Sequence, residues 1–116
     1  MPKKHSPCIM NLDELKNIGT HWVCCMPANK TTLWYFNSFG MHYPKEFEIR
    51  AKKDKMQVIY NTTKYQDIKS VLCGYFCIYV LHQWKLGNDF YDILKPLSMT
   101  DMIANENFVI DYFKNI

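Results

Sequence analysis

Long apolar runs, tracts rich in glycine or proline and a large net charge are all missing from this sequence. The longest apolar run, VLCGYFCIYVL, covers only residues 71–81, whereas a membrane-spanning helix needs about 20 residues. The four glycines and five prolines stand singly, and neither an internal repeat nor a low-complexity tract is present. We therefore expect no membrane span and a single domain over residues 1–116.

The net charge is only +3, and the basic residues are spread along the chain. One modest cluster, RAKKDK, contains Arg50, Lys52, Lys53 and Lys55. A solvated helix face gives this pattern more often than a nucleic-acid site does. The cluster permits a weak DNA contact and argues for nothing stronger.

The start of the chain, MPKKHSPCIM, lacks the apolar stretch of a secretory leader. The five cysteines form an odd set, which consists of Cys8, Cys24, Cys25, Cys73 and Cys77. Because disulfides persist mainly in oxidising compartments, we expect a reduced, intracellular protein. We also expect a monomer.

Hydrophobic residues make up 48% of the chain and aromatic residues 16%, which is far from the composition of a disordered protein. After a short irregular start, THWVCCM (20–26) and TTLWYFN (31–37) are predicted to be paired strands, with PANK as the hairpin turn. A helix is expected over residues 44–53, with acidic residues early and basic residues late, as the helix dipole favours. A short strand over residues 56–61 follows.

Ser70 is expected to cap a long apolar helix that begins at Val71 and ends near Gly87. Two more helices are expected in residues 88–98 and 100–116, the second capped by Thr100. Its predicted packing residues are Phe108, Ile110, Phe113 and Ile116. This order of elements indicates an α+β fold, in which a small, mainly antiparallel sheet packs on one central helix.

The central helix carries Cys73 in its first turn, followed at once by Gly74. The unpaired N–H groups and the positive end of a helix dipole favour a thiolate, which is nucleophilic near neutral pH. Gly74 leaves the backbone open to a substrate carbonyl. An acyl-transfer site also needs a base, a group that orients the base, and donors for the oxyanion.

Each of these roles has a candidate. His21 stands at the head of the first strand, where a rigid element aims its imidazole, and is the best placed of the four histidines. Asn37, at the end of the second strand, offers its side-chain oxygen to the other imidazole N–H. Gln66 offers an amide N–H, and the backbone N–H groups of Cys73 and Gly74 complete the oxyanion donors.

In chain order, GTHWV, YFNSFG and Q-x-x-x-x-x-x-C-G-x-F-C resemble the motifs of the adenovirus-type (adenain-like) maturation cysteine proteases. The resemblance covers about residues 11–94. It is closest to the versions in large self-synthesising DNA transposons and related viruses, and it extends distantly to the SUMO-protease clan. It implies an adenain-like cysteine-protease fold without a cofactor, with Cys73 as nucleophile, His21 as general base and Gln66 as oxyanion donor.

The resemblance also implies an endopeptidase that cleaves after small residues, often glycine, in viral or transposon structural precursors. Its expected location is the host cytoplasm or nucleus, or the virion. Adenoviral members are stimulated by DNA and by a viral peptide. The chain departs from the family at Asn37, where an acidic residue is usual, and in having only twenty residues before His21. A Cys-His-Asn set works in papain-like proteases, so Asn37 is compatible with activity.

Two other interpretations stay open. Asn37 and the short start also fit a protease fold that no longer cleaves and instead binds precursor tails or ubiquitin-like proteins. A zinc-stabilised structural domain would use Cys24, Cys25, Cys73 and Cys77. Against zinc, the chain has no C-x-x-C pair, and adjacent cysteines in a strand point to opposite faces.

Overall fold

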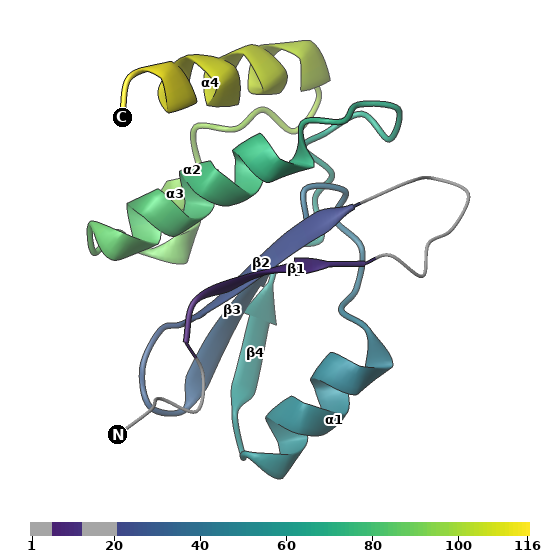
Figure 1. Ribbon diagram of the computed structural model, residues 1–116, viewed down its shortest axis with the longest axis vertical. Coiled ribbons are helices and arrows are strands. Elements are labelled where there is room, and N and C mark those ends of the chain that lie inside the picture. Colours follow the sequence, from purple (N-terminus) through teal and green to yellow (C-terminus); the bar gives the residue numbers. More distant parts are fainter. Residues whose placement is uncertain (1–5, 13–20) are drawn as a thin grey trace.

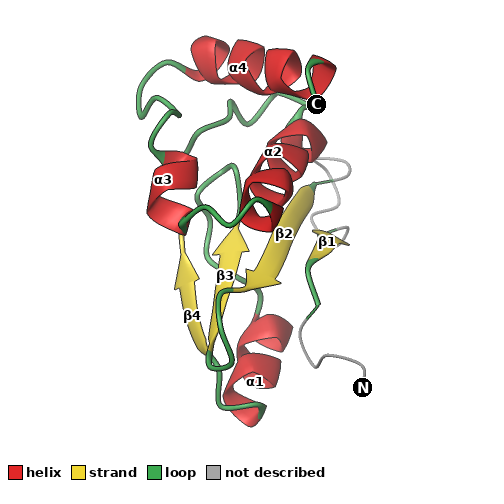
Figure 2. Ribbon diagram, turned by 90° about the vertical axis from the view of Figure 1, so that its left-hand side faces the viewer, coloured by secondary structure: helices red, strands yellow, loops and turns green. Residues whose placement is uncertain are grey.

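The computed structural model describes residues 6–12 and 21–116. The elements are β1 (Cys8–Asn11), β2 (Trp22–Pro27), β3 (Thr32–Phe36), α1 (Lys45–Lys53), β4 (Gln57–Tyr60), α2 (Cys73–Lys85), α3 (Phe90–Leu94) and α4 (Met102–Lys114). The strands form a layer with α1 on one side and α2 on the other, and α4 lies beyond α2, on the side of α2 that faces away from the sheet (Figures 1 and 2). None of the helices in this part of the chain is long and apolar enough to cross a membrane.

The four strands form one sheet in the order β1-β2-β3-β4. The pairings of β1 with β2 and of β2 with β3 are antiparallel, whereas β3 and β4 run parallel and are connected through α1. The fold is therefore α+β with a mixed, mainly antiparallel sheet, as predicted.

The two central strands are buried on both faces, which explains why their sequences are apolar without a simple alternation. The side chains that join the core beneath α2 are Cys24, Met26 and Phe36. Those that join the smaller core beneath α1 are Val23, Cys25 and Tyr35. Cys24 and Cys25 thus point to opposite faces, as expected, and this places Cys25 in a different core from Cys24 and Cys77, two other cysteines of the zinc hypothesis.

Helix α2 is the central helix of the larger core. Its residues Cys73, Phe76, Cys77 and Val80 are buried at helical spacing and share the face turned toward the sheet. Tyr79 lies on another face, where its hydroxyl donates a hydrogen bond to the Ile93 carbonyl at 2.5 Å. Helices α3 and α4 pack on α2 from that side, so that α2 is covered by protein on both sides.

Several predicted boundaries were wrong. The start of the chain is not wholly irregular, because β1 pairs with β2 along its whole length. Helix α2 begins at Cys73 rather than Val71, since the Ser70 hydroxyl accepts a hydrogen bond from the Leu72 N–H and closes a turn instead of capping the helix. Thr20, at the edge of a predicted strand, lies outside the described residues.

The predictions for the last helix also need correction. The N-cap of α4 is Asp101 and not Thr100, because the Asp101 carboxylate accepts the Ala104 N–H at 3.0 Å. Phe113 is 44% exposed and Ile116 57% exposed, so neither is a core residue. Val109 and the polar Asn105 are buried in their place.

Candidate active site

The sulfur of Cys73 lies where the first turn of α2 meets the first residue of β2. The Trp22 N–H donates a hydrogen bond to this sulfur at 3.3 Å, and the Trp22 carbonyl accepts one from the Cys77 thiol at 3.5 Å. Both backbone groups of one strand residue therefore bond successive turns of the helix. This arrangement places the Cys73 sulfur against the backbone of Trp22, the residue that follows His21.

The imidazole of His21 pairs with the side chain of Asn37, with Nε2 and Oδ1 3.0 Å apart. The same Asn37 oxygen accepts the backbone N–H of Phe39 at 2.8 Å. Because a backbone N–H only donates, the atom that it meets must be the amide oxygen. Nε2 of a neutral His21 must then carry the hydrogen, which leaves the lone pair on Nδ1.

The lone-pair nitrogen is buried and unused. His21 is 1% exposed, and its Nδ1 has no hydrogen-bond partner among the described residues. Burial lowers the pKa of His21, while the Asn37 hydrogen bond acts in the opposite direction. The ring of Phe39 stacks on the imidazole with 4.2 Å between centroids and fixes its plane. His21 is thus held as a neutral base with one free acceptor.

The amide of Gln66 is oriented by two hydrogen bonds. Its Nε2 donates to the Ser70 carbonyl at 3.1 Å, and its Oε1 accepts the hydroxyl of Ser38. Since a carbonyl only accepts, the Ser70 contact identifies Nε2. Within the described residues Nε2 makes this one hydrogen bond, and the whole Gln66 side chain is buried, with 0% exposure.

The start of α2 adds two backbone donors. The N–H groups of Cys73 and Gly74 are at the first two helical positions, where an α-helix supplies no partner. Tyr75, the next residue, already donates to the Leu72 carbonyl at 2.9 Å. Among residues 6–12 and 21–116, nothing lies within 4 Å of a Cβ atom built on Gly74, so the described structure leaves open space on this side of the helix terminus. Cys73 itself is 4% exposed.

Sequence reasoning missed the residues that support Asn37. Asn61 is buried, and its side chain accepts the Asn37 N–H at 3.0 Å and donates to the Asn37 carbonyl at 2.7 Å. Gly40 has a φ of 72° and a Cβ there would meet the Thr63 carbonyl at 2.8 Å, so the turn after Asn37 needs glycine. A signal existed: Asn37 and Asn61 each follow the end of a parallel strand, and such ends meet at one edge.

The basic cluster lies away from these groups. Arg50, Lys52 and Lys53 belong to α1, which packs on the face of the sheet opposite α2. The Lys52 ammonium pairs with the Glu48 carboxylate at 2.9 Å. In the described part of the chain, no three His, Cys, Asp or Glu side chains gather in a group that would hold a metal ion.

Comparison with known proteins gives a match by structure only. No protein-family model and no curated protein matches the sequence. The chain is similar to the ASFV pS273R protease, whose crystal structure in selenomethionine form superposes with a TM-score of 0.64 at 17% sequence identity. The match covers 91% of this chain and 42% of that protease, so the chain spans less than half of its length. The fold is that of the SUMO-protease-like cysteine proteases.

Proposed function

We propose that this chain is a cysteine endopeptidase of the adenain-like type, with Cys73, His21, Asn37 and Gln66 as its working groups. The observation that carries the proposal is the fixed tautomer of His21. Asn37 occupies Nε2, and the buried Nδ1 is left with a lone pair and no partner. The residue next to His21 bonds the Cys73 sulfur.

In the first step Nδ1 of His21 takes the proton of the Cys73 thiol, and the thiolate attacks the carbonyl carbon of a peptide bond. The Trp22 N–H bond to the sulfur supports the negative charge in the thiolate. The imidazolium that forms keeps its Nε2 hydrogen bond to Asn37. Thiolate and imidazolium stabilise each other, so the amide of Asn37 is sufficient as the third member of the catalytic triad.

In the proposed mechanism the oxyanion of the tetrahedral intermediate accepts hydrogen bonds from Nε2 of Gln66 and from the N–H groups of Cys73 and Gly74. These donors are fixed before the substrate arrives, Gln66 by Ser38 and Ser70. The substrate carbonyl enters past Gly74, on the open side of the helix terminus.

The intermediate then expels the amine, which takes the proton from Nδ1 of His21, and Cys73 keeps the acyl group as a thioester. A water molecule gives a proton to Nδ1 and attacks the thioester, which releases the carboxylate product and restores the thiol. Substrates of this type are structural precursor proteins of a virus or transposon, cleaved after small residues such as glycine. The support for this specificity is the motif resemblance of GTHWV, YFNSFG and the Cys73 region.

The test combines a peptide library with a covalent probe. Fluorogenic peptides with glycine or alanine before the scissile bond are incubated with the wild type and with Cys73→Ala, His21→Ala and Gln66→Ala. The matched controls are Cys8→Ser and His42→Ala, an exposed thiol and an exposed imidazole. We expect hydrolysis in the wild type and both controls only, and labelling of Cys73 by a glycyl vinyl sulfone. Turnover that survives Cys73→Ala refutes the proposal.

One observation favours a second function, in which the chain binds glycine-rich tails or ubiquitin-like proteins without cleaving them. Cys73 is almost wholly covered, and a buried nucleophile is compatible with a site that no longer turns over. The same peptides separate the two functions. Binding by calorimetry without hydrolysis or probe labelling, in wild type and Cys73→Ala alike, supports the second.

A further inference from the structure

Two thiols outside the candidate active site lie side by side at the edge of the sheet. Cys8 of β1 and Cys25 of β2 are directly opposite in the antiparallel register, and their sulfur atoms are 3.3 Å apart. Both are free thiols in the structure. The proposed peptide hydrolysis uses neither of them.

The backbone already has the geometry of a disulfide. Opposite residues in an antiparallel pair have Cα atoms about 4.5 or 5.5 Å apart, and both values lie within the range of about 4.4–6.8 Å found across disulfides. The two side chains share one face of the sheet, because opposite residues always do. Closing the sulfur separation from 3.3 Å to the bond length of about 2.05 Å takes side-chain rotation alone.

The two thiols differ in exposure and in acidity. Cys8 is exposed, and the hydrogen bond from Cys25, helped by the charge of Arg50, lowers the pKa of Cys8 to about 7. The hydrogen bond to Cys8, together with burial, raises the pKa of Cys25. Cys8 is therefore the thiol that reacts first with an outside reagent, and Cys25 is the neighbouring thiol that can react in a second step.

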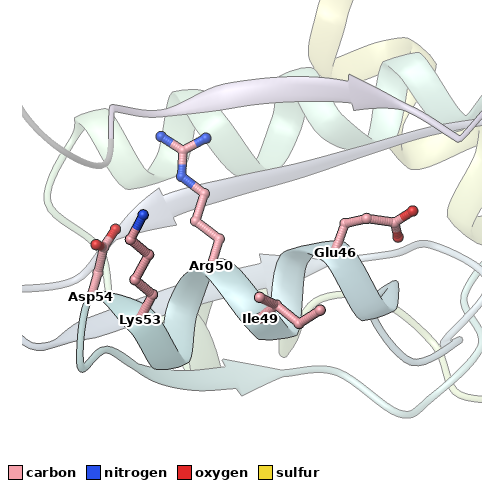
Figure 3. Close-up of a pocket in the computed structure, with 5 residues that line it drawn as sticks. All are labelled: Glu46, Ile49, Arg50, Lys53 and Asp54. Carbon is pink, nitrogen blue, oxygen red and sulfur yellow. The ribbon is translucent and has the colours of Figure 1, made fainter.

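The surroundings leave room for a reagent. Figure 3 shows Arg50 extending from α1 toward the strands at this edge of the sheet. Arg50 and Lys53 line a cavity of about 460 Å³ whose other lining residues are Glu46, Ile49 and Asp54. A small anionic disulfide that approaches Cys8 therefore meets the positive charge of Arg50, the same charge that acts on the Cys8 thiol.

We propose that Cys8 and Cys25 form a reversible disulfide by exchange with a small disulfide of the glutathione class. The Cys8 thiolate attacks one sulfur of the reagent, and one thiolate of the reagent leaves. Cys25 then gives up its proton and attacks the Cys8 sulfur, which releases the second reagent thiolate. Two protein thiols are oxidised, one reagent disulfide is reduced to two thiols, and the two protons pass to the products.

The Cys8–Cys25 disulfide would link β1, a short edge strand, covalently to β2. β1 has four residues and pairs only with β2 within the described part of the chain. Directly after β1, the Leu12 N–H donates to the His21 carbonyl at 2.8 Å. Oxidation therefore stabilises the edge of the sheet that carries His21, whether or not the chain is a peptidase.

The test oxidises the whole chain with glutathione disulfide and compares the wild type with Cys8→Ser. Because Cys8 is exposed, serine there does not endanger folding. Trypsin then yields residues 5–16, with Cys8, and residues 17–30, with Cys24 and Cys25. We expect these peptides to be linked, with fragmentation assigning the bond to Cys25. The thermal midpoint should rise by on the order of 10 °C, reversibly with dithiothreitol, as expected for a loop of this length.

Three results would overturn the inference. They are a glutathione adduct on Cys8 without the linked peptide, a bond between Cys8 and Cys24, and a disulfide between two chains. An oxidised wild type whose thermal midpoint equals that of identically treated Cys8→Ser would overturn the stabilising role. Neither readout depends on peptide hydrolysis, so this inference and the proposed function fail separately.

Discussion

Oδ1 of Asn37 lies 3.0 Å from Nε2 of His21, and both side chains are buried. The second atom of the same amide, Nδ2, has no partner among the described residues. Asn37 thus orients the imidazole through Oδ1, while burial raises the pKa of the Tyr35 hydroxyl and the Asn37 side chain acts on that hydroxyl in the opposite, lowering direction. A carboxylate of the same shape would place an acceptor at both positions and would add a charge that pairs with the imidazolium.

Asn37→Asp tests what the amide contributes. We expect the substitution to raise the pKa of His21, because a carboxylate stabilises the charged ring, and to keep or increase kcat/KM. Asn37→Ala should lower kcat/KM by on the order of 10²-fold, because the ring loses its orientation. Titration of the His21 ring by NMR and peptide hydrolysis measure the two effects. Equal kcat/KM in Asn37→Ala and wild type would show that Asn37 has no role in hydrolysis.

Gly74→Ala separates stability from activity. A Cβ at this helical position meets none of the described residues within 4 Å, and alanine favours a helix by up to about 1 kcal/mol over glycine. The free energy of unfolding should therefore stay equal or rise. The same methyl group would occupy the path of the substrate carbonyl, and kcat/KM should fall at least about 10-fold.

Gly87→Ala is the matched control. Gly87 follows α2 with a φ of 92°, where a side chain is strained even though the space is open. Alanine there should destabilise the protein by about 1 kcal/mol and leave kcat/KM unchanged. Chemical denaturation measures the free energy of unfolding of both variants, and peptide hydrolysis measures their kcat/KM. Unchanged hydrolysis in Gly74→Ala would contradict the proposed entry path of the substrate carbonyl.

The buried His21 makes stability depend on pH. Its pKa is lowered in the folded protein, so near pH 6 the unfolded chain binds more protons at this residue than the folded one. The stability that His21 contributes is complete above the unfolded pKa of about 6.5 and is lost as the pH falls toward the folded pKa. Wild type should therefore lose more free energy of unfolding between pH 8 and pH 5 than His21→Gln. Urea denaturation at both pH values measures this, and an identical loss in the two proteins would show that the ring is not buried as a neutral base.

The proposed site residues could be named from the sequence, whereas the residues that hydrogen-bond to them could not. Cys73, His21 and Gln66 were proposed because their types and order form a motif, and the structure shows the partner of each: Trp22 for Cys73, Asn37 for His21, and Ser38 with Ser70 for Gln66. Ser38 and Asn61 were missed because a hydroxyl or amide in a loop has no periodicity, and its role depends on hydrogen bonds to residues distant in sequence.

The fold class could be predicted because the apolar segments that form most of the core are evident in the sequence. Short or largely exposed elements could not be predicted in this way. β1 has only four residues, and all but one are exposed, so its pattern is not that of a half-buried strand. The start of α2 was misplaced because the Ser70 hydroxyl bonds the amide two residues on, a competing turn that composition does not distinguish from a cap. The last helix shows the same limit, since a phenylalanine there is exposed and an asparagine is buried.

The contrast between Asn105 and Phe113 in α4 gives the last prediction. The Asn105 amide donates to the carbonyls of Tyr65 and Ser98 at 2.9 and 2.8 Å, and its oxygen accepts the Ser98 N–H at 2.6 Å. Asn105→Ala would leave these groups without a partner and should cost about 2–4 kcal/mol. Phe113 is half-exposed and touches Tyr75 by a ring edge, so Phe113→Ala should cost at most about 1 kcal/mol.

The two variants also differ in their expected effect on the site. Tyr65 precedes Gln66, and its N–H donates to the Ser38 carbonyl at 2.8 Å. Asn105 therefore holds the loop that presents the Gln66 amide. At a temperature where both variants stay folded, Asn105→Ala should lower kcat, because an oxyanion donor is displaced, whereas KM changes little. Phe113→Ala should keep both constants. If Phe113→Ala proves the more destabilising substitution, or if Asn105→Ala keeps full kcat, α4 packs on α2 without positioning Gln66.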